Sequence, residues 1–368
     1  MSGPGEAGDA ELARLARARA ARQLLHRPRT HHHPADIARA ICGAQAQELP
    51  AARLHFRARH PSLIAADVER ARTEERSLIR LWLMRNTAHL IATDDLPWMR
   101  PLFAPLMEAF NRRCLGQLGV DANTQARALS GIGRHLGRHG PLTRSELSER
   151  LERSGIPMDP RRRGHIFPLA VSTGLACLGP GDGGSMQLVA AEDWLGTVRD
   201  HGREQALAEL ARRYFAAFGP ATEADFAGWA GLSLRDVRAG MTAIASELRE
   251  APVAGVAAWQ PKGRAPRVAA DDLVRLLPAY DTYLMGHRER RFIAPDRSWA
   301  EIGPGGGILR PTITLRGTAV GTWRLRRAGR RLEAELLPFG QLPPGVLAAV
   351  EGELDDISRF EGAAVSAT

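Results

Sequence analysis

A pattern of two short helices followed by a β element recurs three times along this chain. In the clearest copy, Thr222–Trp229 predicts a short helix, Gly231 a tight turn and Ser233 the cap of a second helix. The apolar residues of that second helix recur at helical spacing: Leu234, Val237, Met241, Ile244 and Leu248. Val253–Trp259 then predicts one strand of a wing. Helix, glycine turn and helix are typical of a helix-turn-helix unit.

The second copy opens at Thr143, which has a glutamate three residues further on, the spacing of a capping box. A second helix is predicted over Ile166–Thr173. Two short apolar runs, Leu175–Leu178 and Met186–Ala190, then flank the Gly/Pro/Asp-rich segment Gly179–Gly184. Apolar strands around a glycine-rich turn predict a hairpin, which would be the wing of this copy.

The first copy is less regular. Pro34–Gln45 predicts a helix, and a second helix near Ser77–Met84 is predicted to run into a strand at His89–Thr93. Residues 95–140 have a helical pattern and would bridge the first two copies. The chain changes character after a flexible turn at Gly303–Gly307. Three strands and a final helix are predicted there: Pro311–Leu315, Thr318–Arg324, Leu332–Leu337 and Gly345–Phe360.

These segments predict a mostly helical α+β chain. We expect about three tandem winged-helix units and a small C-terminal antiparallel sheet with a closing helix. The predicted divisions are a polar tail at 1–20, units at 21–140, 141–200 and 201–270, and the C-terminal domain at 271–368. The alternative interpretation is an ordinary α/β assembly of amphipathic helices.

Charge and cysteine usage restrict the partners and the compartment. The net charge is +9 and the pI about 10.6, which favours a polyanionic partner. No run of about 18 apolar residues occurs, and the N-terminus lacks the apolar core of a secretory signal. The cysteines are odd in number and far apart, which predicts buried reduced thiols and a cytoplasmic protein: Cys42, Cys114 and Cys177.

Metal and cofactor motifs are missing from the sequence. The run His31-His32-His33 invites a metal hypothesis, but consecutive histidines lack ligand spacing and no Cys or Glu cluster joins them. Walker loops, dinucleotide fingerprints and nucleophile elbows are also missing. We therefore expect neither a metal nor a cofactor.

The most distinctive stretch is GAQAQELP, Gly43–Pro50, which holds two glutamines separated by one alanine. Pro50 biases Leu49 away from helical geometry, so the preceding helix is expected to end near Gln47. In an extended segment, positions i and i+2 point to the same side, and the amides of Gln45 and Gln47 would converge. Taken alone, the pair better suits a structural role, in which the two amides only cap or hydrogen-bond a helix end.

Four motifs in order along the chain bear on this choice: Gly43–Pro50, Leu81–Pro97, Gly219–Leu232 and Leu276–Arg290. Together they resemble the winged-helix DNA glycosylases of the AlkZ and YcaQ type, over residues 20–360. The resemblance implies tandem winged helices in a concave scaffold that binds DNA. It places the catalytic Gln-apolar-Gln motif on Gln45-Ala46-Gln47. This double-glutamine form is associated with bulky N7-alkylguanines and interstrand crosslinks, whereas a Gln-Asp form is associated with YcaQ.

The chemistry suits amides. Glutamine cannot act as a general base, but an N7-alkylated guanine is already cationic, so it leaves the sugar without acid assistance. The remaining task is to stabilise an oxocarbenium-like sugar and to place a water, which preorganised dipoles can do. Glycosylases that also cut the backbone form a Schiff base through an amine. Lys262 is the only lysine and is predicted, with Arg264, near the third wing tip, so we expect a monofunctional enzyme.

Further residues are predicted to contact DNA. One group lies where the first copy turns into its wing and would contact phosphate or the lesion pocket, with a solvated turn as the alternative: Arg85, Asn86, Thr87 and His89. A second, basic group would track the DNA backbone: His287, Arg288, Arg290 and Arg291. Asp281 is expected to be structural, paired with an arginine such as Arg290, and a catalytic role is the alternative.

The sequence thus predicts a monomeric DNA glycosylase that acts on cationic N7-alkylguanine in double-stranded DNA, in repair or in resistance to a genotoxic natural product. We expect an open cleft with little base flipping, because a crosslinked base cannot rotate out of the duplex. A winged-helix transcriptional regulator is the alternative, although repeated units without a dimerisation segment disfavour it. A scaffold that has lost its chemistry is a third possibility.

Overall fold

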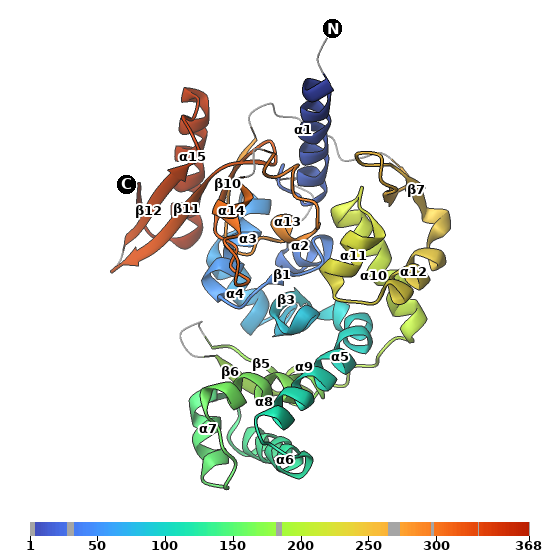
Figure 1. Cartoon of the computed structure of the whole chain (residues 1–368). Coiled ribbons are helices and arrows are strands. Elements are labelled where there is room, and N and C mark those ends of the chain that lie inside the picture. The colour runs from blue at the N-terminus through green and yellow to red at the C-terminus, as the bar shows by residue number, and fades with distance from the viewer. Residues whose placement is uncertain are drawn as a thin grey trace.

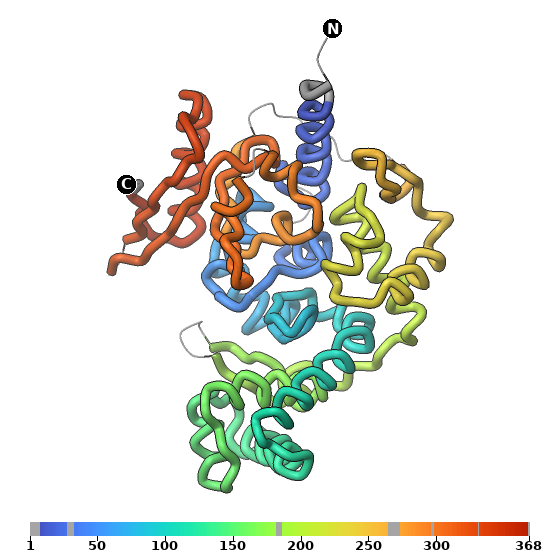
Figure 2. The backbone as a smooth tube through the Cα atoms, viewed as in Figure 1, coloured from blue at the N-terminus to red at the C-terminus, as the bar shows by residue number. Residues whose placement is uncertain are grey.

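Three groups of elements surround the segment that carries the glutamine pair. The computed structural model describes residues 4–27, 33–181, 186–263, 273–295, 298–329 and 331–367. Figures 1 and 2 show the C-terminal sheet on one side of the first copy and the third copy on the other side. The second copy lies below them in the same view. Within the described ranges, none of the helices is both long and apolar enough to span a bilayer.

The first copy contains short helices and three strands: α1 (Pro4–Arg22), α2 (Pro34–Ala40), β1 (Ala44–Gln45), α3 (Leu49–Arg59), α4 (Ala65–Thr73), β2 (Leu78–Trp82), η1 (Met84–Asn86) and β3 (Ala88–Ala92). The helix predicted to end near Gln47 ends at Ala40 instead. Cys42 and Gly43 have φ values of 59° and 87°, which an α-helix cannot continue.

The helix predicted at Ser77–Met84 is wrong, because these residues form strand β2. All five residues of β2 are buried. A strand covered on both faces reads as a continuous apolar run and shows no period of two. The strand predicted at His89–Thr93 is confirmed as β3.

A helical bridge leads into the second copy: η2 (Thr93–Asp95), α5 (Leu96–Gln117), α6 (Ala122–His139), β4 (Leu142–Thr143), α7 (Arg144–Glu152), α8 (Pro160–Ser172), β5 (Ala176–Leu178), β6 (Gln187–Ala190) and α9 (Ala191–Leu195). The capping box is confirmed, since the Glu146 amide donates to Thr143 Oγ1 at 3.2 Å and the Thr143 amide to Glu146 Oε2 at 2.7 Å. The hairpin of β5 and β6 is also confirmed. Residues 182–185 of its predicted turn lie outside the described residues.

The third copy follows the helix-turn-helix prediction: α10 (Arg203–Phe218), α11 (Glu223–Ala230), α12 (Leu234–Ala243), η3 (Ala245–Glu247), β7 (Leu248–Glu250) and β8 (Trp259–Pro261). Gly231 has the left-handed φ of 70° that the turn requires, and Ser233 caps α12. The strand predicted at Val253–Trp259 is mostly the connection between β7 and β8. The Lys262 amide donates to the Glu247 carbonyl, so Lys262 lies at the open end of this hairpin rather than at its tip. Arg264 lies outside the described residues.

The strands of the first two copies form one sheet of six strands in the order β1-β3-β2-β5-β6-β4. Arg80 of β2 pairs with Leu178 of β5, so the two predicted wings meet edge to edge. This pairing satisfies backbone groups that each hairpin would otherwise leave open at its edge.

The C-terminal part confirms the predicted sheet and closing helix: β9 (Val274–Leu277), α13 (Thr282–Met285), α14 (Trp299–Ile302), β10 (Thr312–Leu315), β11 (Thr318–Ala328), β12 (Arg331–Pro338), α15 (Pro344–Glu361) and β13 (Val365–Ala367). The strand order is β13-β12-β11-β10-β9. All pairs are antiparallel except β12 with β13, which is parallel.

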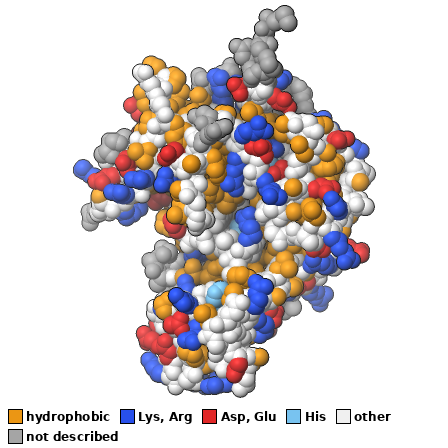
Figure 3. Space-filling model, viewed as in Figure 1, with side chains coloured by type: hydrophobic (Ala, Val, Ile, Leu, Met, Phe, Trp, Pro, Cys, Tyr) orange, Lys and Arg blue, Asp and Glu red, His pale blue; other side chains and the backbone are white. Residues whose placement is uncertain are grey.

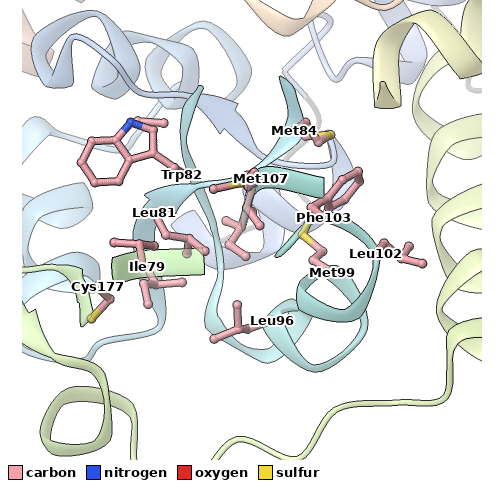
Figure 4. Close-up of a cluster of buried hydrophobic side chains, with 14 of the residues drawn as sticks. Ile79, Leu81, Trp82, Met84, Leu96, Met99, Leu102, Phe103, Met107 and Cys177 are labelled. Carbon is pink, nitrogen blue, oxygen red and sulfur yellow. The ribbon is translucent and has the colours of Figure 1, made fainter. Parts of the chain in front are cut away.

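Two hydrophobic cores meet in the first copy. One core extends from Cys42 to Leu248, and Figure 4 shows its part around β2 and α5. The other core joins residues 24–92 to residues 274–360, with α3 in contact with β9 of the C-terminal sheet and with α15. The segment with the glutamine pair therefore lies between two packed bodies, which hold its backbone in place.

Candidate active site

The glutamine segment is an extended edge strand. Ala44 and Gln45 of β1 pair with Leu90 and His89 of β3, and the Ala46 amide donates to the Ala88 carbonyl at 2.7 Å. A Cβ at Gly43 would lie 2.8 Å from Ile91 Cγ2, so the close approach of the two strands requires glycine there.

The two glutamine amides meet, as the extended geometry predicts. Gln45 Nε2 donates to Gln47 Oε1 at 3.1 Å. The Gln45 residue is 7% exposed, whereas Gln47 is exposed to solvent. Gln45 Oε1 is buried and has no hydrogen-bond partner among the described residues. An unpaired buried carbonyl is unfavourable unless a ligand uses it, so this oxygen suits a cationic centre or a water.

Arg80 holds the backbone of this segment, a role that sequence reasoning missed. Its Nε donates to the Ala46 carbonyl at 2.8 Å, and its Nη2 donates to the Gln47 carbonyl at 2.9 Å. Burial lowers the pKa of Arg80 to about 10, so the side chain stays charged at neutral pH. The available signal was an arginine inside the apolar run Leu78–Trp82, because a buried charge needs partners.

Neutral histidines lie behind the glutamine strand. Burial lowers the pKa of His89 to about 4, and its Nδ1 lies 2.9 Å from the Thr87 carbonyl. Burial likewise lowers the pKa of His55 to about 4, although Asp281 lies 3.7 Å away. The contact of His89 with DNA stays a prediction, and burial counts against it, because the residue is only 2% exposed.

These histidines predict an acid-sensitive fold. The ordinary pKa of histidine is 6.5. Above this pH, both histidines are neutral in the native chain and in the unfolded chain. Below it the unfolded chain binds protons that the native state refuses until about pH 4. The free energy of unfolding should therefore fall with decreasing pH, by up to about 1.4 kcal/mol per pH unit for each histidine. Urea melts between pH 7 and pH 5 measure this.

A single substitution separates the effect of histidine protonation from a general sensitivity of the fold to acid. His89→Gln should flatten the pH dependence, whereas His139→Gln, on the exposed face of α6, should leave it unchanged. A stability that is level from pH 7 to pH 5 in the wild type would contradict the prediction.

The turn from β2 to β3 positions three of the predicted DNA-contacting residues. Arg85 and Asn86 both have left-handed φ values, 54° and 59°. Arg85 is exposed, and its Nη1 donates to the Gly228 carbonyl at 3.2 Å. The Thr87 hydroxyl donates to the Met84 carbonyl at 3.0 Å, which leaves it little freedom to bind elsewhere.

The predicted basic group divides into exposed and buried members. His287 is 4% exposed and its Nε2 lies 2.8 Å from the Phe218 carbonyl, which counts against the predicted contact with DNA. Arg288 is exposed. The Arg290 guanidinium lies over the Trp299 ring at 4.1 Å. Arg291 is exposed and pairs with Glu289 at 3.2 Å.

Arg85, Arg288 and Arg290 form one basic surface around Gly228 of α11. The Arg288 side chain would lie 3.3 Å from a Cβ at Gly228, and Gly228 also accepts from Arg85. Burial, and after it the Arg85 charge, lower the pKa of Arg290. Figure 3 shows Lys and Arg side chains gathered in the middle of this face of the molecule.

Asp281 is structural, as predicted, but its partner is Arg59 rather than Arg290. Two hydrogen bonds of 2.8 Å join the Arg59 guanidinium to Asp281, and both side chains are fully buried. Asp281 also accepts from the Tyr283 amide at 2.9 Å and so caps α13.

The histidine run does not gather ligands in the part of the chain that the structure describes. His33 caps α2 through Nδ1 and pairs with Glu75 through Nε2 at 2.7 Å. His31 and His32 lie outside the described residues. Nowhere in the described ranges do three His, Cys, Asp or Glu side chains come together as metal ligands.

Comparison with known proteins is consistent with this geometry. A family model described as "DNA glycosylase AlkZ-like" matches residues 38–360. The solved structure of Streptomyces sahachiroi DNA glycosylase AlkZ is similar in fold, with a TM-score of 0.77 and 23% sequence identity over 97% of this chain and 99% of that one. No curated protein matches the chain significantly.

Proposed function

The chain belongs to the AlkZ-like DNA glycosylase family, and we propose that it hydrolyses the N-glycosidic bond of cationic N7-alkylguanines and leaves an abasic site. Bulky adducts and interstrand crosslinks belong to the proposed substrate class, in repair or in resistance to a genotoxic natural product. We propose that its target is double-stranded DNA and that the active protein is a monomer.

One observation carries this proposal: the amides of Gln45 and Gln47 meet at 3.1 Å, and no described residue bonds to the buried Gln45 oxygen. Neither amide can supply a proton, and a cationic base needs none to leave. As the glycosidic bond breaks, positive charge moves onto the sugar. Carbonyl oxygens held in advance stabilise that charge and orient the attacking water.

The surrounding scaffold suits double-stranded DNA. We assign the three helical copies with their β elements to winged-helix units, of which α11 and α12 form the clearest helix-turn-helix. The basic surface of Arg85, Arg288 and Arg290 would neutralise backbone phosphates beside the glutamine pair. Binding should therefore weaken steeply as salt increases.

The test is release of 7-methylguanine from methylated duplex DNA, followed by chromatography of the free base. Release by the wild type, with an abasic site left in the strand, supports the proposal. If the protein releases neither 7-methylguanine nor a bulkier N7 adduct, yet binds one DNA sequence tightly, a regulatory role replaces it.

Absence of lyase activity is a separate prediction. Lys262 carries the only side-chain amine of the chain, and its backbone lies at the open end of the β7–β8 hairpin. Borohydride should therefore trap no covalent complex with lesion DNA, because Schiff-base formation needs an amine at the sugar. A trapped complex that disappears in Lys262→Ala would contradict this.

The two contacts of Arg80 predict that this residue positions the backbone of the glutamine segment. Arg80→Lys keeps the charge but replaces two nitrogens of a rigid, planar guanidinium with a single nitrogen on a flexible chain, so the Gln47 backbone gains freedom. We expect kcat for 7-methylguanine release to fall by roughly 10–100-fold with little change in KM, since small misplacements of reacting groups are costly. Arg76→Lys, on an exposed side chain nearby in sequence, is the control. An unchanged kcat in Arg80→Lys would show that the clamp is dispensable.

A further inference from the structure

A pocket of about 400 Å³ lies between helix α3 and the C-terminal sheet. Glu48 and Pro50, which come just after the glutamine pair, belong to one wall at the start of α3. Leu325 and Arg326 of β11 belong to the opposite wall. Segments that are far apart in the sequence therefore build this pocket, and one of them is continuous with the segment that carries Gln47.

Most of the lining is apolar. Trp323 and Leu332 belong to it and are only 1% and 3% exposed. Pro278 and Pro311 add two flat rings. An apolar cavity of about 150 Å³ takes up benzene, a ring of the same size as a pyrimidine. The space between α3 and the sheet is therefore large enough for a pyrimidine base with its sugar.

The pocket lining also leaves polar groups available to a ligand. Arg53 lines the pocket, and its terminal nitrogens pair with Glu69 at 3.3 Å and with Glu361 at 3.6 Å. Arg53 Nε is buried and has no hydrogen-bond partner in the described part of the chain. The Glu48 side chain does not cap α3, so its carboxylate can accept a hydrogen bond. One donor and one acceptor in an apolar lining match the edge of a nucleobase.

The pocket lies close enough to the glutamine pair to meet the other DNA strand. Glu48 is the residue after Gln47, and Pro50 is three positions from it. At about 3.3 Å per residue of extended chain, this wall begins within roughly 10 Å of the glutamines. The grooves of B-DNA are about 6–12 Å wide. A nucleotide across the groove from a lesion at the glutamine pair can therefore reach the pocket.

The chemistry of a crosslink limits which base can move. Guanine pairs with cytosine, so two guanines joined through N7 on opposite strands belong to different base pairs. A guanine held in this way cannot rotate out of the duplex. The cytosine opposite it carries no crosslink, and it can leave the duplex at the usual cost of unstacking one base. Movement of the cytosine therefore opens the base pair around a lesion that itself stays in place.

We propose that this pocket binds the cytosine opposite the alkylated guanine after that cytosine leaves the duplex. The N4 amino group of cytosine is a donor, and the Glu48 carboxylate accepts from it. Arg53 Nε donates to the acceptor atoms of the same base. Arg326 and Arg327, which are exposed at the pocket, supply positive charge for the phosphate of this nucleotide. This inference rests on the proposed glycosylase activity and adds a contact to the strand opposite the lesion.

The test compares release of 7-methylguanine from two duplexes, one with cytosine opposite the lesion and one with a tetrahydrofuran abasic analogue there. Ala51→Phe fills the pocket from the α3 wall. It should raise KM for the cytosine duplex by about tenfold with little change in kcat, as expected when one bound base is lost. On the tetrahydrofuran duplex, which offers no base, KM should stay within about twofold of wild type. Ala122→Phe, at an exposed alanine of α6, is the matched control.

A second variant removes a contact without filling the pocket. Glu48→Ala should raise the ratio of KM on the cytosine duplex to KM on the tetrahydrofuran duplex by about threefold. This ratio cancels the general effect of removing a negative charge near DNA, because that effect acts on both duplexes. Equal thermal melting of wild type and variants shows that the substitutions do not act through folding.

The other outcomes separate the pocket from the glycosylase activity. Equal changes on both duplexes, or no change on either, in both variants overturn the pocket assignment, while the glycosylase proposal stands. A wild type that releases 7-methylguanine from neither duplex overturns the proposed function, and this inference with it.

Discussion

Exchange of Gln47 for alanine is expected to lower the rate of 7-methylguanine release by about 10²–10³-fold, the loss typical when one preorganised dipole is removed from a developing charge. Gln47 is exposed, and its side chain contacts only the Gln45 amide among the interactions described. The fold should therefore be unaffected. Single-turnover release at saturating enzyme measures the chemical step apart from DNA binding.

Gln45→Ala should reduce release to a similar extent. Because Gln45 Oε1 is buried and has no partner in the described part of the chain, its removal should leave the thermal midpoint unchanged or raise it slightly. If the two amides act as a unit, the double variant loses little more than either single variant. Gln205→Ala, an exposed glutamine at the start of α10, is the control. Release within threefold of wild type in both single variants would remove the glutamines from the mechanism.

The buried pair of Arg59 and Asp281 should give the largest effect on stability. Asp281→Asn leaves the Arg59 charge buried and uncompensated, with both positions fully inaccessible to water. We expect a loss of about 3–5 kcal/mol in the free energy of unfolding, as for other buried pairs that lose one partner. Arg153→Ala, in the exposed pair with Glu149 on α7, should cost about 0.5 kcal/mol or less.

The same pair predicts the direction of a pH effect. Burial acts to raise the pKa of Asp281, but the Arg59 charge and hydrogen bonds outweigh it and lower that pKa in the native state. A carboxyl with a lowered native pKa contributes stability above its unfolded pKa, and that stability is lost as pH falls through the native value. Wild type should thus lose stability in acid more steeply than Asp281→Asn. Parallel curves for the two proteins would show that Asp281 does not titrate in this way.

Interactions between residues that are close in the sequence account for the structural features that were predicted correctly. The capping box at Thr143, the cap at Ser233 and the glycine turn at Gly231 involve residues within a few positions of one another, and all three are confirmed. The convergence of Gln45 and Gln47 followed from an extended backbone near Pro50, and their amides do meet. Short-range geometry carries this information because neighbouring residues are held together by the chain itself.

The sequence-based predictions failed where contacts between distant segments determine the structure. The Ser77–Met84 segment has an apolar run that suits a helix or a strand, and only its position between other elements makes it strand β2. His89 and His287 are polar residues in basic motifs, yet packing buries both of them. The partner of Asp281 is Arg59, 222 positions away, rather than the nearby Arg290.

Residue patterns along the chain were enough to predict the repeated helical segments, the C-terminal sheet with its closing helix, and the glutamine pair as the distinctive chemical group. Three features depend on how distant segments pack: the first two copies share a sheet, Arg80 donates to the Ala46 and Gln47 carbonyls, and the Gln45 oxygen is buried with no partner among the described residues. The physical reason is the range of the interactions. Caps and turns act within one turn of chain, whereas burial, desolvation and charge pairing depend on which distant segments pack together.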